Sequence, residues 1–171
     1  MTAPEAIKDT HRRTAEKYGF RPAAHSDIPE LRSLFTETVL TINRKDYTQD
    51  EVEDWASCGE AATHWEDLLG RLHFIVATES GGRIAGFTSI SDEGYLHSMF
   101  VHRDLQGKGI ATALLSRAEE YARSHGIPCM KSDVSITARL FFERRGYTVE
   151  KEQKAKARLL YMTNFRMTKA L

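Results

Sequence analysis

The sequence has 171 residues, which is enough for one domain with a hydrophobic core of its own. Its 24 basic and 24 acidic residues give a formal net charge of zero, so we expect neither a nucleic-acid partner nor attachment to an anionic membrane. The two cysteines form no disulfide framework, and no apolar run is long enough for a membrane span or a signal peptide. We therefore expect a cytoplasmic protein.

The first part of the chain is expected to be mainly helical. Residues 1–19 are polar and weakly periodic, which predicts an N-terminal arm ahead of a single domain over residues 20–171. Apolar residues at helical spacing predict a helix that begins near Asp27 and a second helix opened by Thr48. A third helical segment is expected around Trp65.

From Leu72 onwards the pattern changes to that of β-strands. His73–Thr78 and Arg83–Ser91 flank the pair Gly81-Gly82, so they predict a hairpin. The apolar, β-prone stretch Tyr95–Val101 predicts a central strand that reaches into the interior.

Strands and helices alternate in the rest of the chain. A helix that begins near Ile110 is expected to end at Gly126. The remaining segments are expected to be a strand, a helix and two closing strands, at Cys129–Ser135, Thr137–Arg145, Tyr147–Glu150 and Leu159–Lys169. Because hairpins adjoin a crossover helix in this order, we predict an α/β fold with a mixed sheet.

The loop between the central strand and its helix is the most informative stretch. Two glycines break it, and it must end as the first turn of a helix. Free N–H groups at a helix start attract anions, and residues without Cβ let a phosphate approach closely. We therefore interpret this loop as a phosphate or pyrophosphate cradle. Its residues are Gln106, Gly107, Lys108, Gly109, Ile110, Ala111 and Thr112.

Three known phosphate-binding loops share features with this stretch. A P-loop is excluded by its spacing, and in a dinucleotide fold Thr112 would stand where the third glycine is needed. The segment Gln106–Ala111 resembles the Gln/Arg-x-x-Gly-x-Gly/Ala loop that binds the acyl-CoA pyrophosphate in the GNAT superfamily of N-acetyltransferases. A glycine-rich turn that caps an ordinary helix is the alternative.

The resemblance to the GNAT superfamily covers nearly the whole chain. Ser135–Tyr147 is similar to the family segment Asn-x-x-Ala-x-x-x-Tyr-x-x-x-Gly-Phe, and the element order from Phe20 to Leu171 also follows the family. The resemblance implies a single-domain fold with a mixed, mostly antiparallel sheet of about seven strands, flanked by helices. It also implies that the sheet is splayed between the central strand and the next, with acetyl-CoA as acyl-donor cosubstrate in the split.

Two residues depart from the family pattern at positions that the resemblance assigns to cofactor binding. Ser135 replaces the usual asparagine, and Phe142 replaces a tyrosine that is commonly assigned as the acid for the CoA thiolate. Phenylalanine has no proton to donate. The proton must therefore come from water or from another residue such as Tyr161, unless protonation is unnecessary.

Acetyl transfer to an amine requires the neutral amine, whose pKa in water is about 10.4, so a base, a water chain or a desolvating pocket is needed. Alternation along the central strand is expected to give two faces, with Tyr95, His97 and Met99 on one and Leu96, Ser98 and Phe100 on the other. His97 titrates nearest to neutral pH and is the candidate base, and a satisfied or surface histidine is the alternative. Tyr95 stands where some GNAT enzymes carry a catalytic glutamate, and it could orient a water or donate a hydrogen bond.

The end of the same strand is expected to contact the cofactor through its main chain. A splayed strand leaves N–H groups unpaired, so those near Met99, Phe100 and Val101 are the candidate contacts for the oxyanion and the pantetheine arm. No metal site is expected, because His125 and Cys129 alone do not define one.

Charge gives a hint about the acceptor. Eight acidic residues and no lysine or arginine lie between residues 46 and 67, namely Asp46, Asp50, Glu51, Glu53, Asp54, Glu60, Glu66 and Asp67. In GNAT folds the helices before the first hairpin wall the acceptor pocket, so an acidic wall would favour a cationic amine. A solvated helix face is the alternative.

The sequence as a whole predicts an N-acetyltransferase. The expected reaction moves an acetyl group from acetyl-CoA to a primary amine of a small molecule or peptide, directly in a ternary complex, because nothing marks a covalent acyl-enzyme. The protein could act as a homodimer. The rival functions are a catalytically silent acyl-CoA sensor and an unrelated nucleotide-binding domain.

Overall fold

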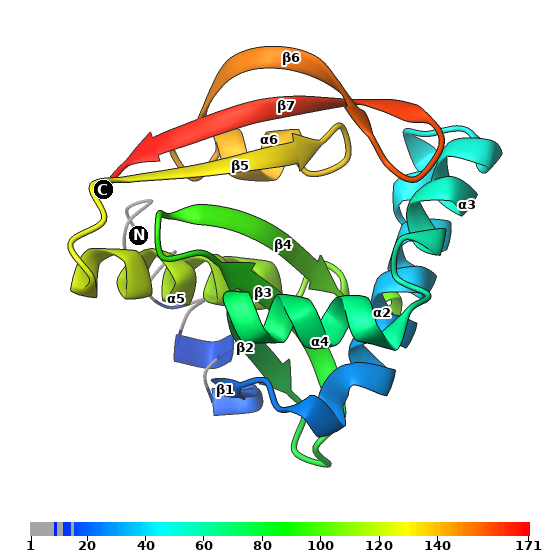
Figure 1. Cartoon of the computed structure of the whole chain (residues 1–171). Helices are drawn as coiled ribbons and strands as arrows, with labels where there is room; N and C mark the ends of the chain where they lie inside the picture. The colour runs from blue at the N-terminus through cyan, green and yellow to red at the C-terminus, as the bar shows by residue number, and fades with distance from the viewer. Residues whose placement is uncertain (1–8, 10–11, 15) are drawn as a thin grey trace.

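A seven-stranded sheet organises the fold, with the strand order β1-β2-β3-β4-β5-β7-β6 (Figure 1). In this computed structural model the described residues are 9, 12–14 and 16–171. The strands are β1 (Gly19–Pro22), β2 (His73–Thr78), β3 (Ile84–Ile90), β4 (Tyr95–Val101), β5 (Cys129–Ser135), β6 (Thr148–Lys156) and β7 (Tyr161–Ala170). The helices that pack around them are α2 (Ile28–Thr41), α3 (Gln49–Ser57), α4 (Ala62–Arg71), α5 (Ile110–Ser124) and α6 (Arg139–Glu143). The α/β class and the mixed sheet are confirmed.

The sheet splits between β4 and β5, as the resemblance implied. These two strands run parallel and are paired at Tyr95–Lys131 and Leu96–Ser132. Just there, the Ser132 hydroxyl donates a hydrogen bond of 2.9 Å to the carbonyl of Leu96. Beyond this point the strands diverge, so β5, β7 and β6 form one arm and β1 to β4 the other (Figure 1).

An extra residue in β4 changes the side-chain pattern that alternation predicts. In the antiparallel β3–β4 pair Ser89 faces Ser98 and Ile90 faces Leu96, so His97 is the additional residue of a bulge. A bulge inserts one unpaired residue and re-aims the side chains that follow it.

The predicted faces of the central strand are therefore wrong. Leu96 and Met99 both pack into the core cluster around α5, although they were assigned to opposite faces. Phe100 packs instead into the core cluster around α2. Regular alternation assumes an uninterrupted strand, and the bulge at His97 breaks it.

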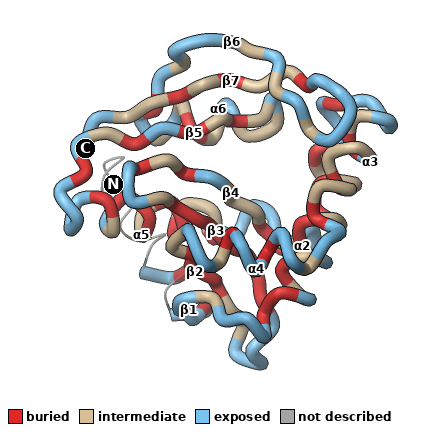
Figure 2. Tube along the Cα trace, viewed as in Figure 1, coloured by how far each residue is buried: buried red, intermediate tan, exposed pale blue. Residues whose placement is uncertain are grey.

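Helices cover both faces of the sheet, and each covered face has its own core. On one face, α2, α3 and α4 pack against β2 and β3 around residues such as Leu31 and Phe87. On the other face, α5 packs through Leu114 and Leu115. The buried segments in Figure 2 follow β2, β3 and these helices, whereas the outer strand β6 is largely exposed.

Two predicted elements differ in length from the observed ones. The helix predicted over Thr137–Arg145 is limited to α6, because Ala138 N donates to the Ser135 hydroxyl at 3.2 Å and closes a turn first. The strand predicted over Tyr147–Glu150 extends to Lys156. Its continuation is a charged edge strand whose side chains mostly face solvent, and such a strand lacks apolar alternation.

The predicted N-terminal arm lies partly outside the described residues, and its boundary at residue 19 stays a prediction. Within the described part, Tyr18 is 3% exposed and packs in a cluster with Ile110 and Leu114 of α5. None of the helices in the described part of the chain is long and apolar enough to cross a membrane.

Candidate functional site

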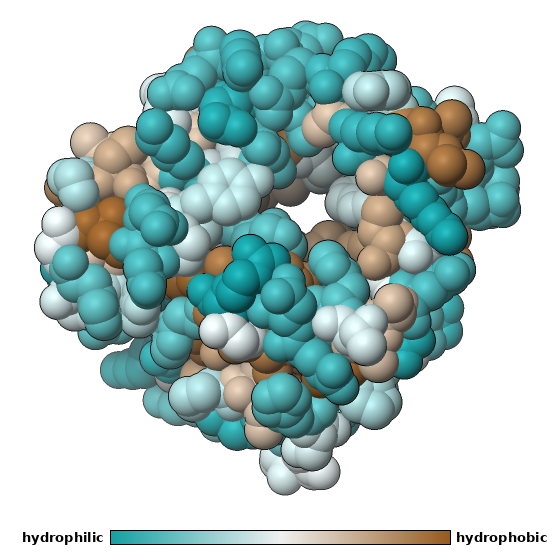
Figure 3. Space-filling view, viewed as in Figure 1, coloured by the Kyte–Doolittle hydropathy of each residue, from teal (hydrophilic) through white to brown (hydrophobic). Residues whose placement is uncertain are grey.

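The split between the two arms of the sheet encloses the main cavity, of about 650 Å³. Its walls come from β4, β5, β7, the start of α5 and the helical region from α2 to α4. Figure 3 shows the opening near the centre of the molecule. A cavity of this size suits a small ligand or the reactive end of a larger one.

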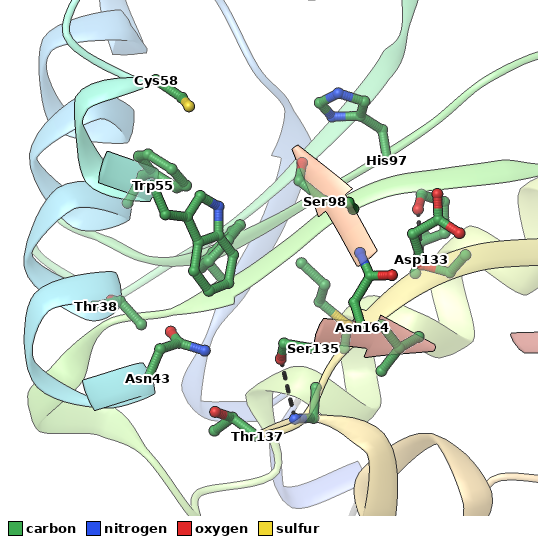
Figure 4. Close-up of a pocket in the computed structure, with 18 of the residues that line it drawn as sticks. Thr38, Asn43, Trp55, Cys58, His97, Ser98, Asp133, Ser135, Thr137 and Asn164 are labelled. Carbon is green, nitrogen blue, oxygen red and sulfur yellow. Dashed lines mark hydrogen bonds between the residues drawn. The ribbon is translucent and has the colours of Figure 1, made fainter. Parts of the chain in front are cut away.

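Aromatic side chains form the wall on the side of α2, α3 and α4. The ring of Phe35 meets Phe100 edge-to-face at a centroid distance of 5.0 Å, and Trp65 meets Phe35 in the same way at 5.8 Å. Trp55 lies 6.1 Å from Phe100 and projects into the cavity (Figure 4). This wall can pack against an apolar or aromatic ligand.

The predicted acidic wall is wrong. All eight of those acidic residues are described, and none of them lines the cavity. Glu51 accepts from Thr48 N at 2.9 Å and caps α3, while Asp67 pairs with Arg71 at 2.7 Å. Asp54 accepts main-chain N–H groups of the β6–β7 turn, including those of Leu159 at 2.9 Å and Leu160 at 3.0 Å. These carboxylates therefore stabilise helices and a turn.

Tyr47 crosses the split and was missed in the sequence analysis. Its hydroxyl donates to the carbonyl of Thr163 at 2.7 Å and accepts from Ile136 N at 2.9 Å. Burial raises the pKa of Tyr47. The residue lies in a short polar connection without periodicity, so the sequence carried no signal that it lines the cavity.

The predicted residue Tyr95 is held by a carboxylate on the other arm. Its hydroxyl donates to Asp133 Oδ2 at 3.0 Å, and the same carboxylate accepts from Arg166 Nη2 at 3.1 Å and from Gln153 Nε2 at 2.9 Å. Burial, with the charge of Asp133, raises the pKa of Tyr95 to about 12. Burial opposes ionisation of Asp133, but the hydrogen bonds from Arg166 and Tyr95 outweigh it and lower the pKa of Asp133. The Tyr95 hydroxyl is thus held in place by Asp133 and keeps its proton at neutral pH.

His97, the candidate base, lies at the rim of the same cavity (Figure 4). Its side chain keeps access to solvent and makes no side-chain hydrogen bond to another described residue. Desolvation by the surrounding protein, followed by the positive charges of His64 and Arg71, lowers the pKa of His97. The imidazole is therefore neutral at pH 7 and free to accept a proton.

The main chain at the end of β4 supplies hydrogen-bond donors on the side of the split. His102 N donates to Ala85 O at 2.8 Å, and in an antiparallel pair alternate residues bond to the partner strand. By this alternation Phe100 bonds to β3, whereas Met99 and Val101 direct their main-chain groups away from β3. Consistent with this direction, Val101 O accepts from Gln106 Nε2 at 2.7 Å. Phe100, the third of the predicted residues, also lines the cavity, and its ring packs against Phe35 in the aromatic wall.

The predicted phosphate loop has the geometry of an anion site. Gly107 and Gly109 adopt left-handed conformations with φ of 71° and 81°, which glycine tolerates without strain. A Cβ added at Gly107 would meet no atom within 4 Å, so the space in front of the loop is open. Lys108 is exposed beside it.

The helix that follows offers unpaired donors to this space. Its first intrahelical bond runs from Ala113 N to Gly109 O at 3.0 Å. The N–H groups of Ile110, Ala111 and Thr112 therefore precede the first helical hydrogen bond and can bind phosphate oxygens. The loop and the helix start thus have the geometry of an anion-binding site.

Ser135 and Phe142 both line the cavity but have local structural partners. The Ser135 hydroxyl accepts from Ala138 N and so positions the turn before α6. Phe142 is 3% exposed, and its ring meets Tyr147 edge-to-face at 5.1 Å. The alternative proton donor Tyr161 is 61% exposed, lies outside the cavity lining and stacks near the Lys156 ammonium. This position gives no support to Tyr161 as the proton source for the thiolate, which leaves water or no protonation at all as the alternatives.

In the part of the chain that the structure describes, no group of three or more His, Cys, Asp or Glu side chains could hold a metal ion. The free thiol of Cys58 lines the cavity, and burial followed by the charge of Asp54 raises its pKa. Cys58 is thus mainly a thiol at neutral pH, and the thiolate is the nucleophilic form.

Comparisons with known proteins agree on one family. Residues 43–169 match the family model described as an acetyltransferase (GNAT) domain. The chain is 29% identical over 147 residues to the uncharacterized N-acetyltransferase YafP of Escherichia coli, covering 82% of this chain and 88% of that protein. It is 30% identical over 152 residues to an L-methionine sulfoximine/L-methionine sulfone acetyltransferase of Pseudomonas aeruginosa, covering 78% and 85%.

Solved structures show the same fold. A GCN5-related N-acetyltransferase from Rhodopseudomonas palustris aligns with a TM-score of 0.87 and 25% identity, covering 91% of this chain and 96% of that one. The PaiA N-acetyltransferase from Thermoplasma acidophilum, solved in complex with coenzyme A, aligns with a TM-score of 0.75 and 16% identity, covering 90% and 99%.

Proposed function

Because the chain belongs to the GNAT superfamily of acetyl-CoA-dependent N-acetyltransferases, we propose that it transfers the acetyl group of acetyl-CoA to a primary amine of a small molecule. One observation carries the proposal. A single cavity in the split sheet joins the anion-binding loop at the start of α5 to an aromatic pocket under α2, α3 and α4. A donor and an acceptor can therefore meet in one ternary complex.

The loop and β4 have separate tasks in binding the donor. Acetyl-CoA supplies an activated acetyl group as a thioester. The N–H groups of Ile110, Ala111 and Thr112 would hold its pyrophosphate. The main chain of Met99 and Val101 would bind the pantetheine arm and stabilise the oxyanion that forms when an amine attacks the thioester carbonyl.

His97 is the proposed base. Its neutral imidazole would accept a proton from the acceptor ammonium, directly or through a water molecule, and so release the neutral amine that attacks the thioester carbonyl; the C–S bond then breaks and CoA leaves as the thiolate. Tyr95, held by Asp133, would orient the acceptor or that water by donating or accepting a hydrogen bond. The raised pKa of Cys58 favours direct transfer over a covalent acyl-enzyme.

The acceptor is proposed to have an apolar or aromatic body. Asp133 is the acidic residue among the described residues that line the cavity, and its carboxylate is already paired with Arg166. The acidic wall that favoured a cationic acceptor is absent from these walls, which present Trp55 and Phe100. A Pseudomonas relative that is named for methionine derivatives supports an acceptor of small size.

The test is an amine panel with acetyl-CoA as donor. The panel should contain aromatic and aliphatic monoamines, methionine sulfone and a polyamine, with release of the CoA thiol and the mass of the product as readouts. We expect turnover with at least one monoamine and a weaker response to the polyamine. Acetyl-CoA binding by calorimetry without turnover of any amine would favour a silent acyl-CoA sensor. Absence of binding would overturn the proposal.

A further inference from the structure

Arg145 has an unusual electrostatic environment for a half-buried arginine. Its Nη1 donates to Phe141 O at 3.0 Å, its Nη2 donates to the Thr112 hydroxyl, and its guanidinium carbon lies 3.7 Å from the centroid of the Phe141 ring. Its Nε is buried without a hydrogen-bond acceptor. Among the described residues it pairs with no carboxylate, whereas Arg139 and Arg166 do so with Glu143 and Asp133.

The backbone fixes Arg145 at this place. Gly146 follows it with a φ of 86°, and two hydrogen bonds, Gly146 N to Glu143 O and Tyr147 N to Phe142 O, both 3.1 Å, close the end of α6. This pair of bonds around a left-handed glycine is the Schellman motif, a rigid helix ending. The direction of Arg145 is therefore set by the local fold.

The guanidinium reaches from one arm of the split sheet to the other. Arg145 follows α6, which belongs to the β5 arm, and Thr112 lies in the first turn of α5, which follows β4. The ring on which the guanidinium stacks, Phe141, lines the cavity. The cation thus lies beside the unpaired N–H groups at the start of α5.

A half-buried cation without a carboxylate partner favours an anionic ligand. Burial without a counter-charge is unfavourable, and the guanidinium fork matches phosphate oxygens in a bidentate manner. Desolvation, followed by the neighbouring charge of Arg144, lowers the pKa of Arg145, which is the expected direction when no anion is near. The helix start next to it favours the same kind of ligand.

We propose that Arg145 is a binding residue for the pyrophosphate of acetyl-CoA, and that this phosphate group supplies the counter-charge that the protein lacks. The proposal rests on the function proposed above, because it takes acetyl-CoA as the ligand of the split. The phosphate site would then have two sides. The N–H groups come from α5, and the positive charge comes from Arg145 on the far side of the split. The Thr112 hydroxyl keeps the guanidinium beside the first turn of α5.

The test compares Arg145→Gln with Arg144→Gln. Arg144 is the adjacent residue and is exposed, so the second variant makes the same change of charge outside the site. Calorimetry with CoA should show binding about tenfold to hundredfold weaker for Arg145→Gln, as expected for the loss of a charge-assisted hydrogen bond. Arg144→Gln should stay within about twofold. Arg145→Lys, which keeps the charge, should lose less than Arg145→Gln and serves if the latter fails to fold.

A donor without phosphates separates binding from a structural role. With S-acetylpantetheine, Arg145→Gln and the wild-type protein should have the same kcat/KM, although they differ with acetyl-CoA. Equal losses with both donors would mean that Arg145 acts as a clasp across the split, and would overturn the proposal. Equal CoA affinities for Arg145→Gln and Arg144→Gln, or for Arg145→Lys and the wild type, would also overturn it. A wild-type protein that does not bind CoA would overturn the proposed function itself.

Discussion

At the scale of single residues, the site contains one hydrogen-bonding group that keeps its proton near neutral pH and one group that titrates at lower pH. Tyr95 is bonded to Asp133 and has a pKa of about 12, so it keeps its proton throughout the neutral range. His97 lies on a bulge, has no described hydrogen-bond partner and has a lowered pKa. If proton transfer limits the rate, its pH dependence should follow His97.

The replacement of His97 by Gln should lower kcat/KM by about 100- to 10,000-fold, in keeping with the usual contribution of a general base. Because the pKa of His97 is lowered, the wild-type kcat/KM should rise with pH through an ionisation below about 6.5 and then level off. The variant should lose that ionisation. The measurement is the pH profile of kcat/KM with a saturating donor.

Tyr95→Phe provides the comparison for this profile. It removes the hydrogen bond to Asp133 and leaves the ring, so kcat/KM should fall while the low-pH ionisation remains. If the profile is unchanged in the His97 variant and in Tyr95→Phe, the proton leaves through solvent and the assignment of His97 is wrong.

At the scale of elements, the sequence predicted the features that depend on residues close together in the chain, such as strand bounds and the loop before α5. β2 and β5 have the predicted bounds, because a continuous apolar run marks His73–Thr78 and alternating burial marks Cys129–Ser135. The loop before α5 was predicted because its glycines and helix start form one continuous stretch. The bulge at His97 was not predictable, since it depends on how β4 pairs with β3.

Residues that act across the split were also beyond the reach of local patterns. Asp133 contacts Tyr95, and Tyr47 contacts Thr163, through pairs that are far apart in the sequence. The acidic run was misinterpreted for a related reason. Composition shows that α3 and α4 carry charge, but tertiary packing decides which of their faces borders the cavity.

The loop before α5 gives the clearest prediction at this scale. Gly109→Asp places a carboxylate and a Cβ at a residue with a φ of 81°, beside the proposed pyrophosphate, and should abolish CoA binding by calorimetry. Gly82→Asp is the matched control, because Gly82 has a φ of 88° and open space in the β2–β3 turn. A folded Gly109→Asp protein that binds CoA as tightly as the control would refute the loop assignment.

The β6–β7 turn should affect the acceptor more than the donor. Asp54 of α3 accepts N–H groups of Leu159 and Leu160 in this turn, and Lys156 just before it lines the cavity. Asp54→Ala should therefore free the turn and raise KM for the amine severalfold, with little change in KM for acetyl-CoA. Steady-state kinetics with each substrate varied in turn provides the measurement.

Glu53→Ala is the control for Asp54→Ala, because Glu53 is the exposed neighbour on the same helix. Faster hydrogen exchange at residues 158–160 in Asp54→Ala alone would show that the turn has loosened. An equal rise in both KM values would contradict the assignment of this turn to the acceptor side.

At the scale of the whole molecule, the proposed function depends on two arms that meet around one cavity. β4 and α5 carry the proposed main-chain donors, whereas Asp133 lies in β5 and Arg145 follows α6. The hydroxyl of Tyr47 reaches across the split to the carbonyl of Thr163 on β7. The homodimer and the cytoplasmic location that the sequence suggested stay predictions. The central claim is that acetyl-CoA binds between the arms.

Hydrogen exchange of the main chain with and without CoA tests that claim most directly. Slower exchange is predicted at Met99 and Val101 and at the start of α5, over residues 110–112, because these N–H groups would be covered by the ligand. Exchange elsewhere on the sheet should change little. Protection confined to the groove that β1 and β2 form with α5, over Phe20, His73 and Arg117, would place the ligand outside the split and contradict the account.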